Sequence, residues 1–286
     1  MKRSLFLLLS VLSLLSLSAC NEIIGNGTVV TETKNVTGFK KLNIKVPAEI
    51  RFTISDVYSV SIKGESNIIS DIETTVTNDE LELEFKDKIN FRYVPTETVI
   101  IHISAPQLDK VRLSGAANFV ALSEIRGGTF SCNASGASKA DLLSLLVDKA
   151  EFDLSGASMV NVEILNSNSV HIETSGASEA MIQQATIQYL SSSSSGASQV
   201  SIKSGTALKQ TIELSGSSSY DGKNLVSKSG DVDASGASDA AVHCEEELTV
   251  SASGASDIQY YGRPNTQLHS SGGFGNQAYQ RISTRC

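Results

Sequence analysis

A short motif, Ser-Gly-Ala-Ser or a close variant, recurs at nearly constant spacing through the C-terminal two thirds of the chain and constrains its fold more than any other feature. Successive copies lie 21, 20, 20, 20, 20, 20 and 18 residues apart, and a weaker Ser-Gly-Gly copy follows 18 residues later. Such a period is typical of repeat architectures, in which each unit buries its apolar face against the next unit. The copies begin at Ser114, Ser135, Ser155, Ser175, Ser195, Ser215, Ser235, Ser253 and Ser271.

Within each repeat, apolar and polar residues alternate on both sides of the motif. If the first Ser is position zero, positions −3 and −1 are mostly apolar or small, as in Phe152 and Leu154, and so are positions +5 and +7, as in Val160 and Val162. A period of two indicates half-buried strands. We therefore expect two short strands per repeat, joined at a tight corner and closed by a less regular third side. Leucines at position +10 mark that third side: Leu145, Leu165 and Leu225.

The glycine is the fixed element of the corner, and glycine adopts a positive φ at no steric cost. Stacked repeats would pair like strands in parallel, about 4.8 Å apart, and would bring the corner serines into a hydrogen-bonded ladder. The chain is thus predicted to be all-β, with a parallel β-helix, or solenoid, of 20-residue coils over residues 114–275. Only the stretch 141–149 has helical character, which predicts a bulge in one coil. The expected corner residues are Gly115, Gly136, Gly156, Gly176, Gly196, Gly216, Gly236 and Gly254.

Residues 28–113 lack the glycine corner but are also strongly β in character. Apolar residues alternate with polar ones over 42–46 and 81–85, and turn signals such as Pro47 separate these runs. A solenoid needs capped ends, because open strand edges recruit other chains. We interpret this region as wider opening coils plus an irregular β cap that is continuous with the repeats. A separate β-sandwich is the alternative.

The N-terminus has the pattern of a bacterial lipoprotein signal. Lys2 and Arg3 precede an apolar run over 5–17 that is too short to span a bilayer, and the run ends in Leu-Ser-Ala-Cys at Cys20. We expect Cys20 to become the acylated first residue of the mature chain and to hold the protein on a membrane. An ordinary secretory signal that happens to end at a cysteine is the alternative.

These features divide the chain into a signal peptide at 1–19, a lipidated N-terminus and linker at 20–27, and a C-terminal tail at 276–286, on either side of the two β regions. Asn21, the residue after the acylated cysteine, favours the outer membrane over the inner one. The sequence does not indicate whether the protein faces the periplasm or the cell surface.

Charge and cysteine content exclude several classes of partner and framework. The whole chain has a net charge of −8, and the loss of Lys2 and Arg3 leaves the mature chain at −10, which argues against a nucleic-acid partner. Three cysteines remain after Cys20. In parallel coils Cys132 and Cys244 lie more than five repeats apart, beyond disulfide reach, so we expect Cys132 in the core, Cys244 exposed or on the third side, and Cys286 in the tail.

The sequence resembles the head GIN domain family of putative auto-transporter adhesins from Gram-negative bacteria. The resemblance is carried by Val-Thr-Gly-Phe at 36–39, Val-Ser-Ile-Lys-Gly at 60–64 and Ala-Pro-Gln-Leu at 105–108, followed by the serial Ser-Gly-Ala-Ser corners, and it covers roughly residues 25–275. It implies a right-handed β-helix on a lipid-anchored or exported chain. It implies no catalytic residues and no cofactor.

One constellation could carry chemistry. Positions −4 and −2 face outward and hold Glu151 and Asp153 in one repeat and His171 and Glu173 in the next, so stacking would bring carboxylates about 5 Å apart. Glu151, Asp153 and Glu173 are therefore a candidate cation or sugar site, although a solvated acidic face is the simpler interpretation. The four histidines share no spacing typical of a metal site.

Two classes of function remain open. We expect a non-catalytic, adhesin-like envelope protein that presents a solenoid face to glycans or protein partners, because the motif is repeated without a unique catalytic set. The alternative is a carbohydrate-active lyase or hydrolase that uses the acidic stripe, which would need two carboxylates at a fixed separation in one cleft.

Overall fold

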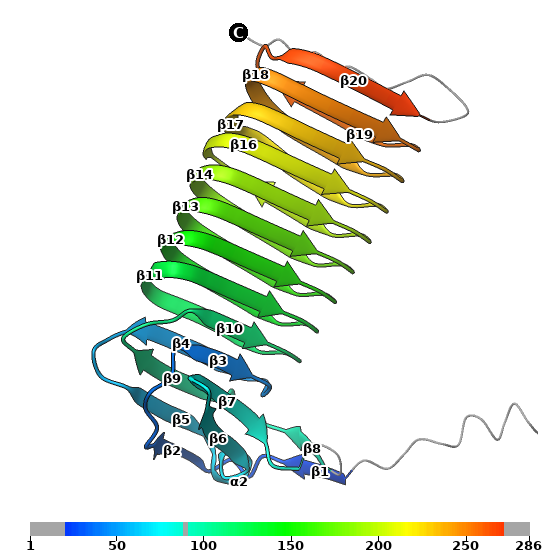
Figure 1. Ribbon diagram of the computed structural model, residues 1–286. Coiled ribbons are helices and arrows are strands. Elements are labelled where there is room, and N and C mark those ends of the chain that lie inside the picture. Colours follow the sequence, from blue (N-terminus) through cyan, green and yellow to red (C-terminus); the bar gives the residue numbers. More distant parts are fainter. Residues whose placement is uncertain (1–20, 88–90, 272–286) are drawn as a thin grey trace, which may run out of the picture.

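The protein is a stack of β-coils closed at its N-terminal end by a smaller β cap (Figure 1). The computed structural model describes residues 21–87 and 91–271. Eighteen strands form one hydrogen-bonded sheet, and β1 (Asn21–Ile24) and β8 (Phe91–Val94) form a separate two-stranded one. The repeat region consists of β10 (Lys110–Leu113), β11 (Asn118–Ala134), β12 (Lys139–Leu154), β13 (Met159–Thr174), β14 (Glu179–Ser194), β15 (Gln199–Ile202), β16 (Gly205–Leu214), β17 (Ser219–Ala234), β18 (Asp239–Ser253), β19 (Asp257–Tyr261) and β20 (Asn265–Ser271).

The repeats stack in parallel with a register of one coil per repeat. Between β12 and β13, Lys139 pairs with Met159 and Leu154 with Thr174, so partners are 20 residues apart at both ends of the ladder. The same 20-residue offset relates β13 to β14. The predicted β-solenoid is therefore confirmed, and every twentieth side chain is a spatial neighbour.

Each coil is more continuous than the sequence pattern indicated. In place of two short strands and an irregular third side, β12, β13, β14 and β17 each run for 16 residues, and only the corner interrupts them. The third side is paired as well, with Leu145 opposite Leu165 and Val147 opposite Ser167. The helical bulge expected at 141–149 is wrong, because this stretch lies inside β12 and pairs with both neighbouring coils. The interruption of the coil lies instead between β15 and β16.

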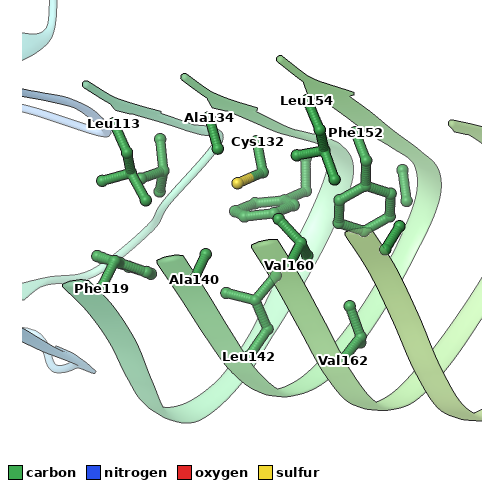
Figure 2. Close-up of a cluster of buried hydrophobic side chains, with 14 of the residues drawn as sticks. Leu113, Phe119, Cys132, Ala134, Ala140, Leu142, Phe152, Leu154, Val160 and Val162 are labelled. Atoms are coloured by element: carbon green, nitrogen blue, oxygen red, sulfur yellow. The ribbon is translucent and has the colours of Figure 1, made fainter. Parts of the chain in front are cut away.

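Inward positions of facing sides fill a narrow apolar core. Positions −3 and −1 on one side face positions +5 and +7 on another, and large side chains such as Phe119 and Phe152 lie near small ones such as Ala140 and Cys132 (Figure 2). This alternation of sizes lets thin coils pack densely without tryptophan. The predicted third-side residues Leu145, Leu165 and Leu225 are fully buried.

The cysteines of the repeat region are buried and unpaired. Cys132 and Cys244 are both free thiols, as the register argument predicted, and Cys132 lies in the core as expected. Cys244 is also buried, and it pairs with Ser227 on the third side, so of the two places expected for it the third side is correct and an exposed position is wrong. Burial raises the pKa of the Cys132 thiol to about 12, which keeps it protonated and unreactive. Cys286 falls outside the described residues.

The corner has the geometry predicted for glycine. The corner glycines from Gly115 to Gly254 all have φ between 71° and 79°. From Gly136 to Gly254, the amide after each corner glycine donates a hydrogen bond to the glycine carbonyl of the preceding coil, for example from Ala157 to Gly136 at 2.7 Å. In the coils from Ser138 to Ser238, the fourth residue of the motif is a buried serine whose hydroxyl caps the turn. Ser158 Oγ, for example, donates to the Ser155 carbonyl at 2.9 Å and to the Ala134 carbonyl at 3.0 Å.

The N-terminal region continues the stack and then ends it. It consists of β2 (Val29–Lys34), β3 (Lys41–Ile44), β4 (Glu49–Ile54), β5 (Ser59–Glu65), α2 (Ser66–Ile69), β6 (Ile72–Thr77), β7 (Glu80–Phe85) and β9 (Ile100–Ala105). Strand β3 pairs in parallel with β10, and β4 pairs in parallel with β11, so the first coil rests directly on this region. Farther out, β2 and β9 pair antiparallel with β5, and β6 pairs antiparallel with β7, which ends the parallel stacking.

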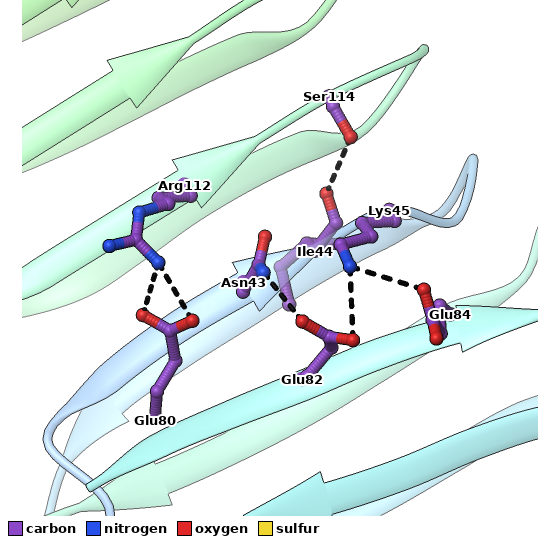
Figure 3. Close-up of polar contacts among 8 residues, drawn as sticks. All are labelled: Asn43, Ile44, Lys45, Glu80, Glu82, Glu84, Arg112 and Ser114. Atoms are coloured by element: carbon purple, nitrogen blue, oxygen red, sulfur yellow. Dashed lines mark hydrogen bonds and ion pairs between the residues drawn. The ribbon is translucent and has the colours of Figure 1, made fainter. Parts of the chain in front are cut away.

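A group of ion pairs ties the cap to the first coil (Figure 3). Arg112 on β10 reaches across β3 to Glu80 on β7, with Nη1 2.7 and 2.6 Å from the two carboxylate oxygens. Lys45 lies 3.0 Å from Glu82 and 3.1 Å from Glu84, and hydrogen bonding to Glu82 raises its pKa. These contacts link three successive strands on the outer surface.

One buried carboxylate holds the far end of the cap together. Glu65 ends β5 with only 1% of its surface exposed, and it accepts hydrogen bonds from the backbone amides of Gly27, Thr96 and Glu97 and from the Thr96 hydroxyl. These donors, led by the Thr96 hydroxyl, lower the pKa of Glu65 to about 2. Gly25 allows this closure, because a Cβ at that position would overlap the Glu65 carboxylate.

The hydrogen bonds that the Glu65 carboxylate accepts predict a pH dependence of cap stability. Its folded pKa of about 2 lies below the ordinary value of 4.5, so its contribution is complete above pH 4.5 and is lost as pH falls towards 2. Glu65→Gln should destabilise the cap at pH 7, because an amide NH₂ would face backbone donors, and should flatten the pH dependence between pH 5 and 2. Hydrogen exchange at 25–34 and 94–99, with Glu73→Gln as the exposed control in the cap, measures both effects. Equal acid sensitivity in the variant and the native protein would contradict this role.

Candidate functional site

The outward residues of the coils form three long sides. We define side A as positions −6 to −1 before the corner (149–154 in β12), side B as positions +4 to +8 after it (159–163 in β13), and side C as the stretch between them (164–168 in β13). Because the register is constant, equivalent residues form columns with about 4.8 Å between rungs. Any surface site on the solenoid is therefore assembled from residues about 20 apart in sequence.

The predicted acidic residues lie on side A, each engaged by its own neighbour. Lys149 Nζ is 2.5 Å from Glu151, Asn133 donates to Asp153 at 3.1 Å, and His171 Nε2 lies 2.9 Å from Glu173. In the part of the chain that the structure describes, no three His, Cys, Asp or Glu side chains lie close enough together to hold a metal ion. The trio Glu151, Asp153 and Glu173 is thus part of a charged, solvated face, and the structure does not gather it into a cation site.

A second acidic pair lies farther along side A. Glu213 and Asp233 occupy neighbouring rungs and line a small groove of about 230 Å³, whose remaining wall consists mainly of serines. No basic side chain lines it. The pair therefore lacks the positive group that a polysaccharide lyase of the expected kind would need beside its carboxylates.

A larger groove on side A surrounds Tyr189 and has a volume of about 430 Å³. It lies within the range of small-ligand sites. Its outward residues are Lys149, Ser169, His171, Tyr189, Ser191, Lys209 and Thr211. Of these, only His171 belongs to the charged constellation that the sequence pattern indicated. The signal that could have found the groove is a lone aromatic at position −6, between a serine and a lysine at the same position of adjacent coils.

An apolar groove of about 490 Å³ lies on side B of the first coils. Leu122 and Leu143 are half-exposed there, with Met159 and Met181 beside them. Carboxylates stand at its rim, where Asp141 pairs with Lys139 at 2.7 Å. Side C carries a third, polar groove in which Gln188 donates to Asn168 at 3.0 Å.

The interior also contains a polar cluster. The Tyr220 hydroxyl donates to Gln210 Oε1 at 3.0 Å, and the Gln210 amide donates to Ser227 Oγ at 2.8 Å, with Cys244 next to both. All four side chains are buried, and burial raises the pKa of both Tyr220 and Cys244. A protonated thiol without solvent access is no nucleophile, so this cluster serves packing.

Cys20, the expected lipidation site, lies outside the described residues. Between residues 21 and 271, apart from the short gap at 88–90, no helix has the length and apolar character needed to cross a bilayer.

Comparison with known proteins agrees with this architecture. The sequence profile of the family described as "Putative auto-transporter adhesin, head GIN domain" matches twice, over residues 38–164 and 152–264. A search of curated proteins gave no significant match.

Solved structures share the fold at low sequence identity. A putative adhesin from Parabacteroides distasonis has a TM-score of 0.70 at 19% identity, with 88% of this chain and 97% of the other covered. A putative adhesin from Parabacteroides merdae has a TM-score of 0.67 at 18% identity, with coverage of 88% and 96%. A putative lipid binding protein from P. distasonis also scores 0.67, at 16% identity, with coverage of 88% and 97%.

Proposed function

Because this chain belongs to the head GIN domain family of putative auto-transporter adhesins, we propose that it is a non-catalytic, adhesin-like protein of the cell envelope. Its solenoid sides present columns of side chains to glycans or to protein partners. The observation that carries this proposal is repetition. The same strand geometry recurs on every rung, so outward residues of successive coils line up in continuous columns, and this gives an extended contact surface in place of a single reaction centre.

The surface chemistry supports a binding role over a catalytic one. Acid–base hydrolysis of a glycosidic bond needs two carboxyl groups held on opposite sides of the bond in one cleft. On side A, Asp153 and Glu173 are neighbours on one sheet surface and point the same way, each held by a separate partner. Glu213 and Asp233 are arranged likewise. Open grooves on the other two sides, one apolar and one polar, add surface for contact.

The proposal includes a lipid anchor at the N-terminus. The Leu-Ser-Ala-Cys sequence ending at Cys20 and the preceding apolar run support acylation of that cysteine, and Asn21 supports sorting to the outer membrane. In the described part of the chain, the cap is the end nearest to Cys20, since β1 begins at Asn21. If the protein is anchored through Cys20, the membrane would lie at the cap end and the repeats would project away from the membrane.

Binding without cleavage is the direct test of the proposed function. The mature lipoprotein, purified in detergent, is applied to arrays of polysaccharides and of extracellular matrix proteins, and the same polysaccharides are assayed for new reducing ends and unsaturated products. We expect retention on the array with no depolymerisation. Glu173→Gln should also give no depolymerisation, since this exposed carboxylate acts in no reaction. Depolymerisation that Glu173→Gln or Glu213→Gln abolishes would establish the enzyme in its place.

If acyl chains on Cys20 hold the protein on a membrane, removal of the Cys20 thiol should release the protein from the membrane. Cys20→Ser removes the acceptor for acyl chains, and several chains anchor far more firmly than one, because each buried CH₂ contributes about 0.8 kcal/mol. The native protein should label with radioactive palmitate and partition into Triton X-114, whereas Cys20→Ser should do neither. Cys286→Ser is the matched control and should behave as the native protein. Equal detergent partitioning of both variants would rule out anchoring through Cys20.

A further inference from the structure

Tyr189 stands out on the surface of the solenoid. Its side chain is 52% exposed, and among residues 21–87 and 91–271 it is the only aromatic one that is exposed to this extent. It projects from side A in the middle of the stack, next to the buried Leu190, and it lines the groove of about 430 Å³. Stable folding does not require an aromatic ring at this position, since Lys149, Ser169 and Lys209 hold the same position in other coils.

The register places polar groups on each side of the ring. Tyr189 pairs with Ser169 on one neighbouring rung and with Lys209 on the other, and Lys149 lies one rung beyond Ser169. A parallel column two residues along the strand carries His171, Ser191 and Thr211. Three rungs separate Lys149 from Lys209, which is about 14 Å at the usual strand spacing. The groove is therefore a strip along the solenoid axis, with an aromatic platform between two lysines.

We propose that this strip binds an uncharged glycan chain laid along the solenoid axis, with a sugar ring stacked on Tyr189. The proposal rests on the binding function proposed above and names its ligand class and site. One face of a sugar ring presents C–H groups, which are apolar and slightly positive, and the face of an aromatic ring is apolar and negative. The Tyr189 ring lines the groove and is about half-exposed to solvent, so it is accessible to such a contact.

The neighbouring side chains suit the hydroxyls of a sugar. Serine and threonine hydroxyls donate and accept, and a lysine ammonium donates up to three hydrogen bonds. Within the described residues Lys209 has no ion-pair partner and is free to donate to a ligand, whereas Lys149 is held by Glu151. A few placed polar groups around an apolar platform are what fix the orientation of a ligand in a groove.

Charge on side A selects against an acidic glycan. Lys149 and His171 are already paired with Glu151 and Glu173. The adjacent column at position −2 carries carboxylates on four of five successive rungs, namely Asp153, Glu173, Glu213 and Asp233, with Ser193 between them. A uronate or sulfate chain in the groove would lie along this column and be repelled by it, in a mature chain of net charge −10 by sequence. An uncharged chain meets no such repulsion.

Affinity electrophoresis of the mature lipoprotein in detergent tests the proposal. Gels contain one neutral polysaccharide each (mannan, dextran, laminarin or xyloglucan) or one acidic polysaccharide (polygalacturonate or chondroitin sulfate). We expect retardation by at least one neutral polysaccharide, unaffected by 0.5 M NaCl, and none by the acidic ones. Tyr189→Ala should weaken the retardation about tenfold or more, and Lys209→Ala severalfold. Tyr189→Phe, which keeps the ring, should bind as the native protein does.

Controls separate loss of the site from loss of the fold. Lys228→Ala removes an exposed lysine from side C and should leave retardation unchanged. Tyr189 is half-exposed, so its alanine variant should keep the native circular dichroism spectrum and thermal midpoint.

Three results would overturn the proposal: no retardation in any of the four neutral gels, retardation by the acidic polysaccharides alone, or equal retardation of native and Tyr189→Ala proteins. Retention of the protein on matrix-protein arrays together with any of these results would leave the proposed envelope function standing. Depolymerisation of a polysaccharide would instead refute that function.

Discussion

The structure depends on the contact between one glycine corner and the next. From Gly115 to Gly236, the carbonyl of each corner glycine accepts a hydrogen bond from the following coil, and the next glycine stacks directly above it. A Cβ on Gly156 would lie 2.8 Å from the Gly136 carbonyl oxygen, so the corner excludes every side chain as well as requiring a positive φ. Because stacked corners lie so near to one another, neighbouring coils have little freedom to slip along each other. The register of one coil per repeat follows from this contact.

The register has consequences inside and outside the coil. Inside, it aligns the buried serines of the motif, whose hydroxyls donate hydrogen bonds to corner carbonyls such as those of Ser155 and Ser175. It also forms a core from side chains too small to form one within a single repeat. On the outer surface, the register aligns residues that are about 20 apart in sequence into columns. Tyr189 lies beside Lys209 for this reason. The cap solves the remaining problem of an open end, because β5 and β6 run antiparallel to their neighbours and stop the parallel stacking.

Much of this architecture was predictable from the sequence, for a physical reason. The corner motif is local and repeated, so its spacing fixes the coil length, and alternation at positions −3, −1, +5 and +7 identifies the buried side chains. The third side was harder to predict, since polar residues such as Ser167 are buried there by pairing along the stack. The same limitation led to a helical assignment for 141–149, where neighbouring coils impose a strand. The groove at Tyr189 was missed because its residues share no motif and meet only through stacking.

The stacking of glycines is tested most directly by comparing two alanine substitutions in the full mature protein. Gly115 and Gly176 both have φ of +72°, where alanine costs about 1–2 kcal/mol. A Cβ at Gly115 would meet nothing within 4 Å, whereas a Cβ at Gly176 would lie 2.6 Å from the Gly156 carbonyl oxygen. Urea unfolding should therefore show a clearly larger loss of stability for Gly176→Ala than for Gly115→Ala. Equal losses would mean that backbone conformation alone explains the glycines, and would contradict stacking as the determinant of the fold.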